Sequence, residues 1–272
     1  PRKGRGMNIN DIFGLQGRIA LVTGGSRGIG RMIVEGFLSA GCARVYICAR
    51  KREQVEAAAA ELGERVIGLV ADISSMAGIE ALAADMTARE ERLDILVNNA
   101  GAAWGAPFAD FPESGWDKVC DLNLKSPFFL TQRLHGLLRE GGRDRPAKVI
   151  NIASIDGLRP NAWETYSYQA SKAGLVHLTR RMAARLLEDN IIVSAIAPGA
   201  FPSAMNLAAS RNPQGTGTSI PAGRVGTAED MAGGAIYLAS RAGDYVVGST
   251  LVIDGGVTET SFGGNFGDSA GG

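Results

Sequence analysis

Residues that bind metals or form disulfides are scarce in this chain. It has three cysteines, Cys42, Cys48 and Cys120, which are odd in number and lack the spacing of a metal site. Its two histidines, His135 and His177, argue against a histidine-built zinc site and leave few candidates for a Ser-His-Asp triad. We therefore expect no metal, and free thiols in a reducing cytoplasm.

The chain also lacks an excess of either charge and any long hydrophobic run. Its 28 basic and 28 acidic residues leave no electrostatic footprint for nucleic acid or for an anionic membrane surface. No apolar run approaches the ~20 residues that a membrane span needs. Hydrophobic residues make up 45% of the 272 residues, which is enough for the core of one large α/β domain.

The two ends of the chain differ in composition from the rest. Residues 1–14 read as an N-terminal extension, and residues 1–6 lack the apolar stretch of a signal peptide. We interpret residues 1–6 as a remnant of an expression vector or a disordered extension, and Met7 as the native start. The segment 257–272 is rich in glycine and serine and contains Phe262 and Phe266, so we expect a mobile tail that packs across a subunit contact.

Between these ends, apolar strand-like runs alternate with helix-like segments. Seven nearly continuous apolar runs predict strands at residues 19–22, 45–48, 66–70, 95–97, 149–152, 191–196 and 250–253. The intervening segments predict helices at about 28–40, 53–62, 76–89 and 116–136, and one around Tyr168. This alternation predicts an α/β domain over residues 15–256, with a seven-stranded parallel, doubly wound sheet and helices on both faces. Residues 199–224 lack periodicity, which predicts a long functional loop.

A glycine-rich loop follows the first predicted strand. It reads Thr23-Gly24-Gly25-Ser26-Arg27-Gly28-Ile29-Gly30 and opens the next helix. Glycines there let the backbone turn tightly and approach a pyrophosphate, whose charge the helix N-terminus favours. The position between a strand and a helix therefore indicates a dinucleotide site rather than an ordinary tight turn.

The end of the second predicted strand lacks the acidic residue that would hold a free ribose 2′-hydroxyl. That place holds Ala49-Arg50-Lys51-Arg52. Arg50, helped by Arg27 of the glycine loop, carries the fork-shaped charge that pairs with a 2′-phosphate. We therefore predict a preference for NADP(H) over NAD(H), unless these arginines are solvated surface cations.

Tyr168 and Lys172 lie four residues apart in a predicted helix, so their side chains share one face. A phenol has a pKa near ~10, and a neighbouring cation lowers it, which would let the tyrosine exchange a proton with a carbonyl oxygen. Tyr166, the rival phenol, has Ala170 four residues on and lacks such a cation. On its own the pair is more often solvated, but its context favours Tyr168 as an acid–base residue.

These motifs occur in the order found in the short-chain dehydrogenases/reductases, which the chain resembles from about Leu15 to Gly256. Asn98-Asn99-Ala100-Gly101, Pro198-Gly199 and Asp254-Gly255-Gly256 match further family motifs, and Asp72 looks like the family's adenine contact. The resemblance implies a single-domain Rossmann fold. It also implies that the cofactor is bound by Gly24, Ser26, Arg27, Gly28, Ile29, Gly30, Arg50, Asp72, Ile73, Asn99, Ala100, Gly101, Tyr168, Lys172, Pro198, Gly199 and Ser203.

The resemblance further implies four catalytic residues, Asn123, Ser154, Tyr168 and Lys172. Ser154 would donate a hydrogen bond to the carbonyl oxygen as negative charge develops on it, and Tyr168 would deliver the proton. Lys172 would lower the pKa of Tyr168 and bind the nicotinamide ribose. Asn123 would hold a water that links Lys172 to solvent.

Two positions depart from the family pattern. The family usually has threonine a few residues after Pro-Gly, whereas this chain has Ala200-Phe201-Pro202-Ser203, so Ser203 would supply the hydroxyl with altered geometry. Asn190 stands where the family often has glycine before the sixth strand, and asparagine tolerates the left-handed conformation.

The substrate end is less clearly marked. Trp104, Trp163, Phe201 and Met205, together with Ile155, offer an apolar wall or else belong to ordinary packing. Arg159 would meet an anionic group or remain solvated. The details around Cys48-Ala49-Arg50 and Ala200-Phe201-Pro202-Ser203 most resemble NADPH-dependent β-ketoacyl reductases of the rhamnolipid-associated type. That resemblance implies reduction of a 3-oxoacyl thioester or related ketone to a secondary alcohol.

Three interpretations follow for function. The first is this NADPH-dependent ketone reductase, and the second is an NAD(P)-dependent alcohol dehydrogenase for a sugar, polyol, steroid or aromatic alcohol. The third is a nucleotide-sensing protein without turnover, which the presence of Ser154, Tyr168, Lys172 and Asn123 disfavours. By resemblance, helices around 116–136 and 168–187 pack against a partner to make a homodimer, or a homotetramer that the last strand completes.

Overall fold

Seven strands form one sheet in the computed structural model, which describes residues 8–260. All neighbouring strands are parallel, in the order β3-β2-β1-β4-β5-β6-β7. The predicted α/β class and the seven-stranded doubly wound sheet are confirmed. The strands are β1 (Ile19–Thr23), β2 (Arg44–Ala49), β3 (Val66–Val70), β4 (Ile95–Asn98), β5 (Ala147–Ile152), β6 (Ile191–Pro198) and β7 (Thr250–Ile253).

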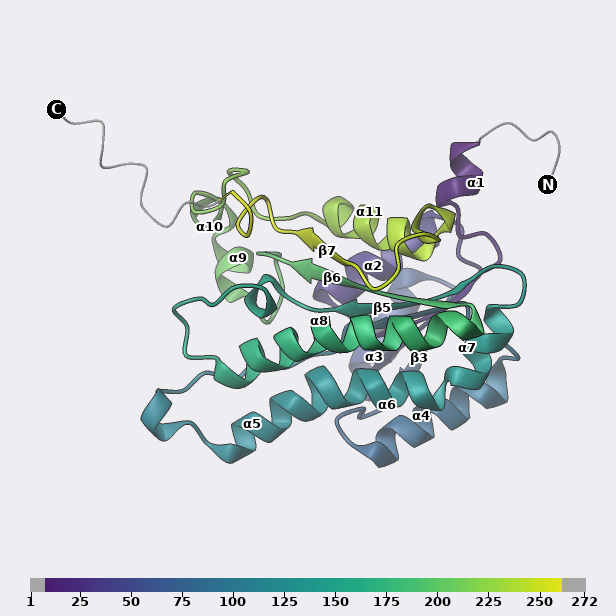
Figure 1. Cartoon of the computed structure of the whole chain (residues 1–272), viewed down its shortest axis with the longest axis horizontal. Coiled ribbons are helices and arrows are strands. Elements are labelled where there is room, and N and C mark those ends of the chain that lie inside the picture. Colours follow the sequence, from purple (N-terminus) through teal and green to yellow (C-terminus); the bar gives the residue numbers. More distant parts are fainter. Residues whose placement is uncertain (1–7, 261–272) are drawn as a thin grey trace.

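Helices cover both faces of this sheet (Figure 1). On one face α2 packs against α11, and on the other α4 packs against α6 and α5 against α8. The helices are α1 (Ile9–Phe13), α2 (Gly28–Ser39), α3 (Arg52–Leu62), α4 (Met76–Arg89), α5 (Glu113–Cys120), α6 (Ser126–Arg133), α7 (His135–Gly141), α8 (Tyr166–Leu186), α9 (Leu207–Arg211), α10 (Pro213–Gly217) and α11 (Ala228–Ala239). Shorter turns are η1 (Phe108–Asp110), η2 (Asp121–Lys125), η3 (Ile155–Gly157), η4 (Leu187–Asp189) and η5 (Arg241–Gly243).

Successive residues of the central strands point to opposite faces. Ala20 and Val22 of β1 belong to the core beneath α2 and α11, whereas Leu21 between them belongs to the core beneath α4, α6 and α8. In β2, Val45 and Tyr46 divide in the same way. Because both faces are buried, these strands appear in the sequence as continuous apolar runs rather than as alternating ones.

The strand order creates a crevice at one end of the sheet. β1 lies between β2 and β4, so the chain runs from β1 toward one edge and returns to β4 on the other side. In open parallel sheets, ligands bind at such a switch point, outside the carboxyl ends of the strands. Thr23 ends β1 and Asn98 ends β4, and both are buried there.

The predicted single helix over 116–136 is wrong in its extent and continuity. Helix α5 begins at Glu113 and is joined by the π-helical turn η2 to α6. Helix α6 ends at Arg133, and α7 begins at His135. Pro127 explains the π turn, because its ring nitrogen cannot donate the hydrogen bond that an α-helix requires to the carbonyl of Asn123. The wider turn lets the helix continue past the proline.

The stretch 199–224, predicted to lack periodic structure, contains two short helices. The side chain of Asn206 accepts a hydrogen bond from the Ala209 amide at the start of α9, and Asn212 does the same for Gly215 in α10. Each helix has five residues, too few to show a helical period. Helix α11 was also absent from the prediction, although the capping box of Thr227 and Asp230 marks its start.

The ends of the described chain are partly ordered against the domain. Helix α1 lies within the predicted N-terminal extension, and Leu15, two residues after its end, is fully buried. Val257, the first residue of the predicted tail, packs on a small apolar cluster with Ile220 and Val225. The interpretations of residues 1–6, Met7, Phe262 and Phe266 lie outside the described residues. Asn190 adopts the left-handed conformation, with φ of 56°, as its sequence position predicted.

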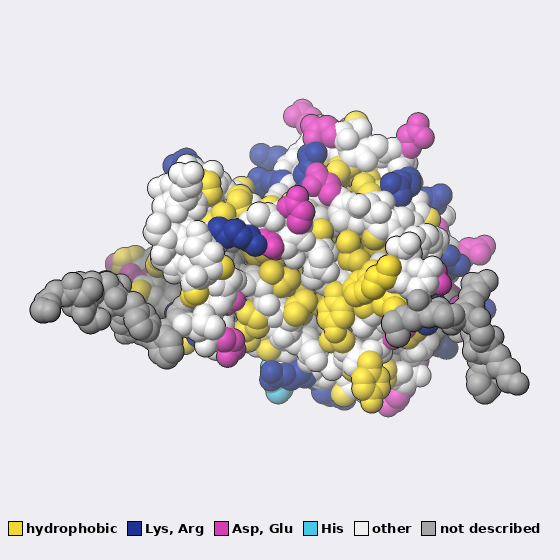
Figure 2. Space-filling model, turned by 90° about the horizontal axis from the view of Figure 1, so that it is seen from above, with side chains coloured by type: hydrophobic (Ala, Val, Ile, Leu, Met, Phe, Trp, Pro, Cys, Tyr) yellow, Lys and Arg dark blue, Asp and Glu magenta, His cyan; other side chains and the backbone are white. Residues whose placement is uncertain are grey.

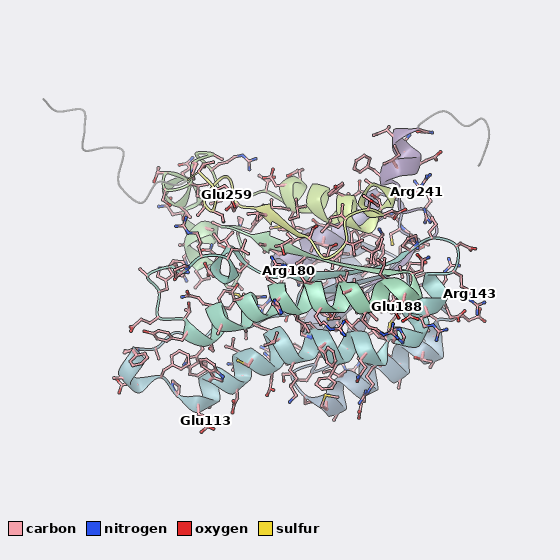
Figure 3. The ribbon with its side chains drawn as sticks, viewed as in Figure 1. Glu113, Arg143, Arg180, Glu188, Arg241 and Glu259 are labelled. Carbon is pink, nitrogen blue, oxygen red and sulfur yellow. The ribbon has the colours of Figure 1, made fainter. Side chains whose placement is uncertain are left out.

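The surface is mixed in character. Figure 2 shows hydrophobic side chains gathered in patches among charged ones on the face that carries α11. No helix among residues 8–260 is long and apolar enough to cross a membrane. Exposed charged side chains lie around the outside of the molecule, as labelled in Figure 3 for Glu113, Arg143, Arg180, Glu188, Arg241 and Glu259.

Candidate active site

A cavity of about 880 Å³ opens at the carboxyl ends of the strands. It is lined by the loops after β1, β2, β3, β4, β5 and β6 and by the first turns of α8. Its size lies at the upper end of the range for ligand sites, ~300–1,000 Å³. The elements that the sequence assigned to nucleotide and to catalysis therefore meet in one place.

The glycine loop forms a cradle that larger residues would fill. Gly24 and Gly28 have positive φ, 65° and 53°, a conformation that other residues rarely adopt. A Cβ atom on Gly30 would lie 2.3 Å from the main-chain oxygen of Gly24, so α2 packs directly on the loop. The first residues of α2, Gly28, Ile29 and Gly30, line the cavity. This geometry fits the pyrophosphate of a dinucleotide.

Thr23 and Asn99 hold this loop to the end of β4. The Thr23 hydroxyl oxygen accepts hydrogen bonds from the amides of Asn99 and Ala100, each at 2.9 Å. The Asn99 side-chain amide donates to the main-chain oxygen of Thr23 at 2.8 Å and to that of Gly24 at 3.3 Å. Asn99 and Ala100 thus fix the floor of the crevice between β1 and β4.

Basic side chains gather at the end of the cavity next to β2. Arg27, Arg50 and Lys51 all line it, and none of them forms an ion pair with another described residue. Arg52, by contrast, lies outside the cavity and pairs with Glu56 at 2.9 Å. Unpaired guanidinium groups at a cavity wall are ready to bind an anion.

Asp72 and Ile73 follow β3 and line the adjoining part of the cavity. The Asp72 carboxylate accepts hydrogen bonds from the amide and the hydroxyl of Ser74, at 3.2 and 2.7 Å. These bonds fix the loop that faces the adenine position expected from the resemblance.

Ser154, Tyr168 and Lys172 meet at the opposite end of the cavity. Ser154 follows β5 and Tyr168 lies on α8, and the Ser154 hydroxyl is near enough to the phenol to favour its ionised form. The Lys172 ammonium is buried and donates a hydrogen bond to the main-chain oxygen of Ile152 at 2.7 Å. Its nitrogen lies 5.7 Å from the centre of the Tyr168 ring. A hydroxyl, a phenol and an ammonium therefore converge where a carbonyl group can bind.

The expectation that Lys172 lowers the pKa of Tyr168 is corrected by this geometry. Burial raises the pKa of Tyr168 to about 12, against the hydrogen bond from Ser154, which favours the phenolate. Burial also lowers the pKa of Lys172 to about 8. The ammonium is turned to the Ile152 oxygen, and burial has the largest influence on the pKa of each group.

Asn123 lies behind the cavity rather than on its wall. It sits in the π turn η2 and is buried, and its side chain both accepts from the amide and donates to the oxygen of Ala102, at 2.8 and 2.9 Å. Its amide also donates to the Ser171 hydroxyl at 3.2 Å. Asn123 thus ties the loop after β4 to α8 next to Lys172.

The predicted apolar wall is partly present. Ile155, Trp163 and Met205 line the cavity, and Trp163 and Met205 are 68% and 52% exposed at its mouth. Phe201 lines it as well but is only 2% exposed and belongs to the main core. Trp104 does not line the cavity: its ring covers Gly115 of α5, with the Lys118 ammonium 5.1 Å from the ring centre.

The loop after β6 reaches the glycine loop. Pro198, Gly199 and Ser203 line the cavity. A Cβ atom on Gly28 would lie 3.2 Å from the Cβ of Ser203, so the two loops touch. The Ser203 hydroxyl oxygen accepts a hydrogen bond from the Asn206 amide at 3.1 Å, which positions it at the start of α9.

Tyr166 and Arg159 point elsewhere. The Tyr166 hydroxyl donates to Glu164 at 3.0 Å, and its ring packs edge-on against Phe108 and Phe111 outside the cavity. Arg159 donates to the main-chain oxygen of Val257 and does not line the cavity. Tyr168 is therefore the phenol that faces the site.

Several lining residues were missed from the sequence, notably Lys51, Asp156, Asn161 and Leu207. Lys51 belongs to the basic run after β2, and Asp156 stands two positions after Ser154. Both residues therefore belong to segments that the sequence had already assigned to the site. The sequence did not show that their side chains point into the cavity.

The chain is similar to known proteins over nearly its whole length. A family model described as enoyl-(acyl carrier protein) reductase matches residues 24–258. The rhamnolipids biosynthesis 3-oxoacyl-(acyl-carrier-protein) reductase of Pseudomonas aeruginosa is 48% identical, with 91% of this chain and 99% of the relative covered. The 2-dehydro-3-deoxy-D-gluconate 5-dehydrogenase of Dickeya dadantii is 38% identical, with 91% and 98% covered.

Solved structures agree with these similarities. The Pseudomonas aeruginosa RhlG/NADP active-site complex superposes with a TM-score of 0.86 at 46% identity, covering 92% of this chain and 99% of that one. A gluconate 5-dehydrogenase from Burkholderia cenocepacia, in complex with NADP and tartrate, superposes with a TM-score of 0.85 at 33% identity, covering 93% and 100%.

Proposed function

The chain belongs to the short-chain dehydrogenase/reductase family and is an oxidoreductase, and we propose that it uses NADPH to reduce a 3-oxoacyl thioester or related ketone to a secondary alcohol. The observation that carries this proposal is one cavity with Ser154, Tyr168 and Lys172 at one end and a glycine cradle with free arginines at the other. The 48% identical 3-oxoacyl reductase supports the substrate class.

The cavity fits NADPH through the cradle and its basic end. Gly24, Gly28 and Gly30 leave room for a pyrophosphate at the start of α2. Arg50, with Arg27 and Lys51, would bind the 2′-phosphate, because charge-assisted and forked hydrogen bonds suit that group. When bound, NADPH supplies the hydride that the reduction needs.

Ser154 and Tyr168 would act on the carbonyl oxygen of the substrate. The Ser154 hydroxyl would donate a hydrogen bond that strengthens as negative charge develops there. Tyr168 would give its phenolic proton to the same oxygen. A pKa near 12 keeps this phenol protonated at neutral pH, and a developing alkoxide is more basic than phenolate, so the transfer is favourable.

Lys172 and Asn123 would support that proton transfer. The Lys172 ammonium would stabilise the phenolate left on Tyr168 and would hold the nicotinamide ribose. Asn123, held by Ala102 and Ser171, would keep the water path beside Lys172 by which Tyr168 is reprotonated. The roles of both residues are those that the family resemblance implies.

An alcohol dehydrogenase for sugar acids is the second candidate function, because several of the relatives and solved structures carry gluconate dehydrogenase names. A panel of carbonyl compounds separates the candidates. It comprises acetoacetyl thioester, β-keto esters, diketones, keto sugars, sugar acids and steroid ketones, each with NADPH and with NADH. We expect the thioester and esters to be reduced fastest with NADPH.

Other outcomes of the panel have definite meanings. Faster turnover of a keto sugar acid would replace the proposed substrate class and keep the mechanism. Silence toward every carbonyl, with NADPH still bound, would leave the nucleotide-sensing interpretation. Activity that survives in Tyr168→Phe at the wild-type rate would refute the assigned proton donor.

We also infer a homo-oligomer in a reducing compartment such as the cytoplasm. Trp116 of α5 and Phe128 of α6 are 43% and 37% exposed, and β7 is a half-buried edge strand of the sheet. The free thiols of Cys42 and Cys48 are buried, and burial raises the pKa of each to about 12, which suits unreactive cysteines. Light scattering that gives a monomer at micromolar concentration would contradict the association.

A further inference from the structure

Asp156 places a carboxylate in the substrate end of the cavity. It is the middle residue of η3, two positions after Ser154. Among the described residues that line the cavity, Asp72 and Asp156 are the only carboxylates. Asp72 follows the edge strand β3, which β2, β1 and β4 separate from β5, a distance of roughly 19 Å at the usual strand spacing. Asp156 is therefore the carboxylate that a substrate beside Ser154 meets.

The backbone holds Asp156 firmly in this place. Its amide donates a hydrogen bond to the Ser154 hydroxyl oxygen at 3.1 Å, and the next amide, of Gly157, donates to the Ser154 main-chain oxygen at 3.0 Å. A Cβ atom on Gly157 would lie 2.5 Å from the main-chain carbon of Lys172. The turn therefore packs tightly against α8, and this contact keeps the backbone of Asp156 at the cavity wall.

No cation compensates Asp156 directly. Among the described residues it forms no ion pair. Lys172 directs its ammonium to the Ile152 oxygen, and Arg159 directs its guanidinium to the Val257 oxygen. Burial raises the pKa of Asp156, while a hydrogen bond with Asn161 and the charge of Arg159 favour the ionised form. The charge reaches the reacting centre, since it also raises the pKa of Tyr168.

We propose that Asp156 is a specificity-determining residue that makes this site reject substrates bearing a carboxylate near the reacting carbon and accept uncharged ones such as esters and thioesters. The carboxylate of such a substrate would be repelled by the negative charge of Asp156, and no free cation at this end of the cavity would pair with it. It would also lie against the apolar side chains of Ile155, Trp163 and Met205, which cannot solvate a charge. The inference rests on the proposed function and deepens it, because it favours acyl esters and thioesters over sugar acids.

The test compares 3-hydroxyoctanoate with its methyl ester, which lacks the negative charge and carries one more methyl group. Their dissociation constants for the enzyme–NADP⁺ complex are measured by calorimetry with wild type, Asp156→Asn and Asp156→Ala. We expect wild type to bind the ester at least about tenfold more tightly than the acid. The reason is the repulsion between the carboxylates of Asp156 and of the acid in a partly buried site. Both variants should reduce that ratio to about threefold or less, because the acid gains affinity.

A matched control removes a carboxylate outside the cavity. Asp110 lies in η1, is exposed and does not line the cavity, so Asp110→Asn should leave the ester-to-acid ratio at its wild-type value. Reduction of methyl 3-oxooctanoate by NADPH is measured in parallel. Absence of that reduction would refute the proposed function, whereas the binding ratio decides the role of Asp156.

Two results would overturn the role of Asp156. One is a wild-type protein that binds the acid as tightly as the ester. The other is a preference for the ester that persists unchanged in both Asp156 variants, which would mean that shape rather than charge excludes the acid. A ratio that falls in Asp156→Asn and Asp156→Ala, and not in Asp110→Asn, supports the proposal.

Discussion

The ammonium of Lys172 donates a hydrogen bond to the main-chain oxygen of Ile152, across 2.7 Å between α8 and the last residue of β5. This bond attaches the helix that carries Tyr168 to the strand that precedes Ser154. The relative position of the phenol and the hydroxyl is thus set by the sheet rather than by a flexible side chain.

Replacement of Tyr168 by phenylalanine should remove the proton donor while leaving the fold intact. We expect kcat to fall by about a hundredfold to ten-thousandfold, the usual contribution of a positioned acid. NADPH affinity, measured by its fluorescence on binding, should change little. Tyr166→Phe is the control, because Tyr166 bonds to Glu164 outside the cavity, and it should keep most of the activity.

Replacement of Lys172 by methionine should stabilise the protein and abolish its activity. Burial lowers the pKa of Lys172 from 10.5 to about 8, so the unfolded chain binds the proton more tightly than the folded one. The free energy of unfolding of wild type should therefore rise with pH between about 8 and 10.5, which follows from proton linkage. Removing the buried charge should raise the free energy of unfolding at neutral pH by about 1–3 kcal/mol. This figure already allows for the loss of the hydrogen bond to Ile152.

Chemical denaturation at several pH values measures this effect. Lys172→Met should lose the rise in stability above about pH 8 that wild type shows. Lys125→Met is the control, since Lys125 is exposed and pairs with Asp121, and it should change stability by less than about 0.5 kcal/mol. A Lys172→Met protein less stable than wild type at neutral pH would contradict the prediction.

Replacement of Arg50 by aspartate should weaken NADPH much more than NADH. Arg50 lines the cavity without an ion-pair partner among the described residues, and a forked contact to a phosphate is worth about 10–100-fold in affinity. The KM values for the two cofactors measure the change. Arg52→Asp makes the same charge change two residues further along, outside the cavity lining, and should leave the NADPH-to-NADH ratio close to wild type. A wild-type preference for NADH would refute the assignment.

Two glycines on packed helices should respond oppositely to alanine. Gly36 of α2 faces α11, where an added Cβ would lie 2.6 Å from the Cβ of Ala232, so Gly36→Ala should destabilise by about 1–3 kcal/mol through overpacking. Gly233 of α11 is exposed and has nothing within 4 Å of the added atom. Gly233→Ala should therefore stabilise by up to about 1 kcal/mol, the helix-propensity difference. Thermal unfolding of both variants checks the pair.

Sequence patterns predicted well those features that repeat or are local. The strand runs were visible because residues such as Val22 and Leu21 are buried on opposite faces of one sheet. The helical spacing of Tyr168 and Lys172 required only that α8 form. The glycine loop was visible because its backbone conformations nearly demand glycine at positions 24 and 28.

Features that depend on direction and environment were beyond the sequence. Trp104 and Trp163 are equally aromatic, yet one covers Gly115 and the other faces the cavity, because distant elements decide where each ring turns. The pKa of Tyr168 is raised mainly by its burial, which the spacing of Tyr168 and Lys172 along the chain does not reveal. Helices α9 and α10 depend on asparagine caps that look like any polar loop residue.

The contact between Ser203 and Gly28 has a kinetic consequence. The same segment carries Met205 and Leu207 at the mouth of the cavity, so it would cover a pyrophosphate bound on the glycine loop. We therefore expect ordered kinetics, in which the nucleotide is added before the carbonyl substrate and released after the alcohol, and product inhibition patterns measure this order.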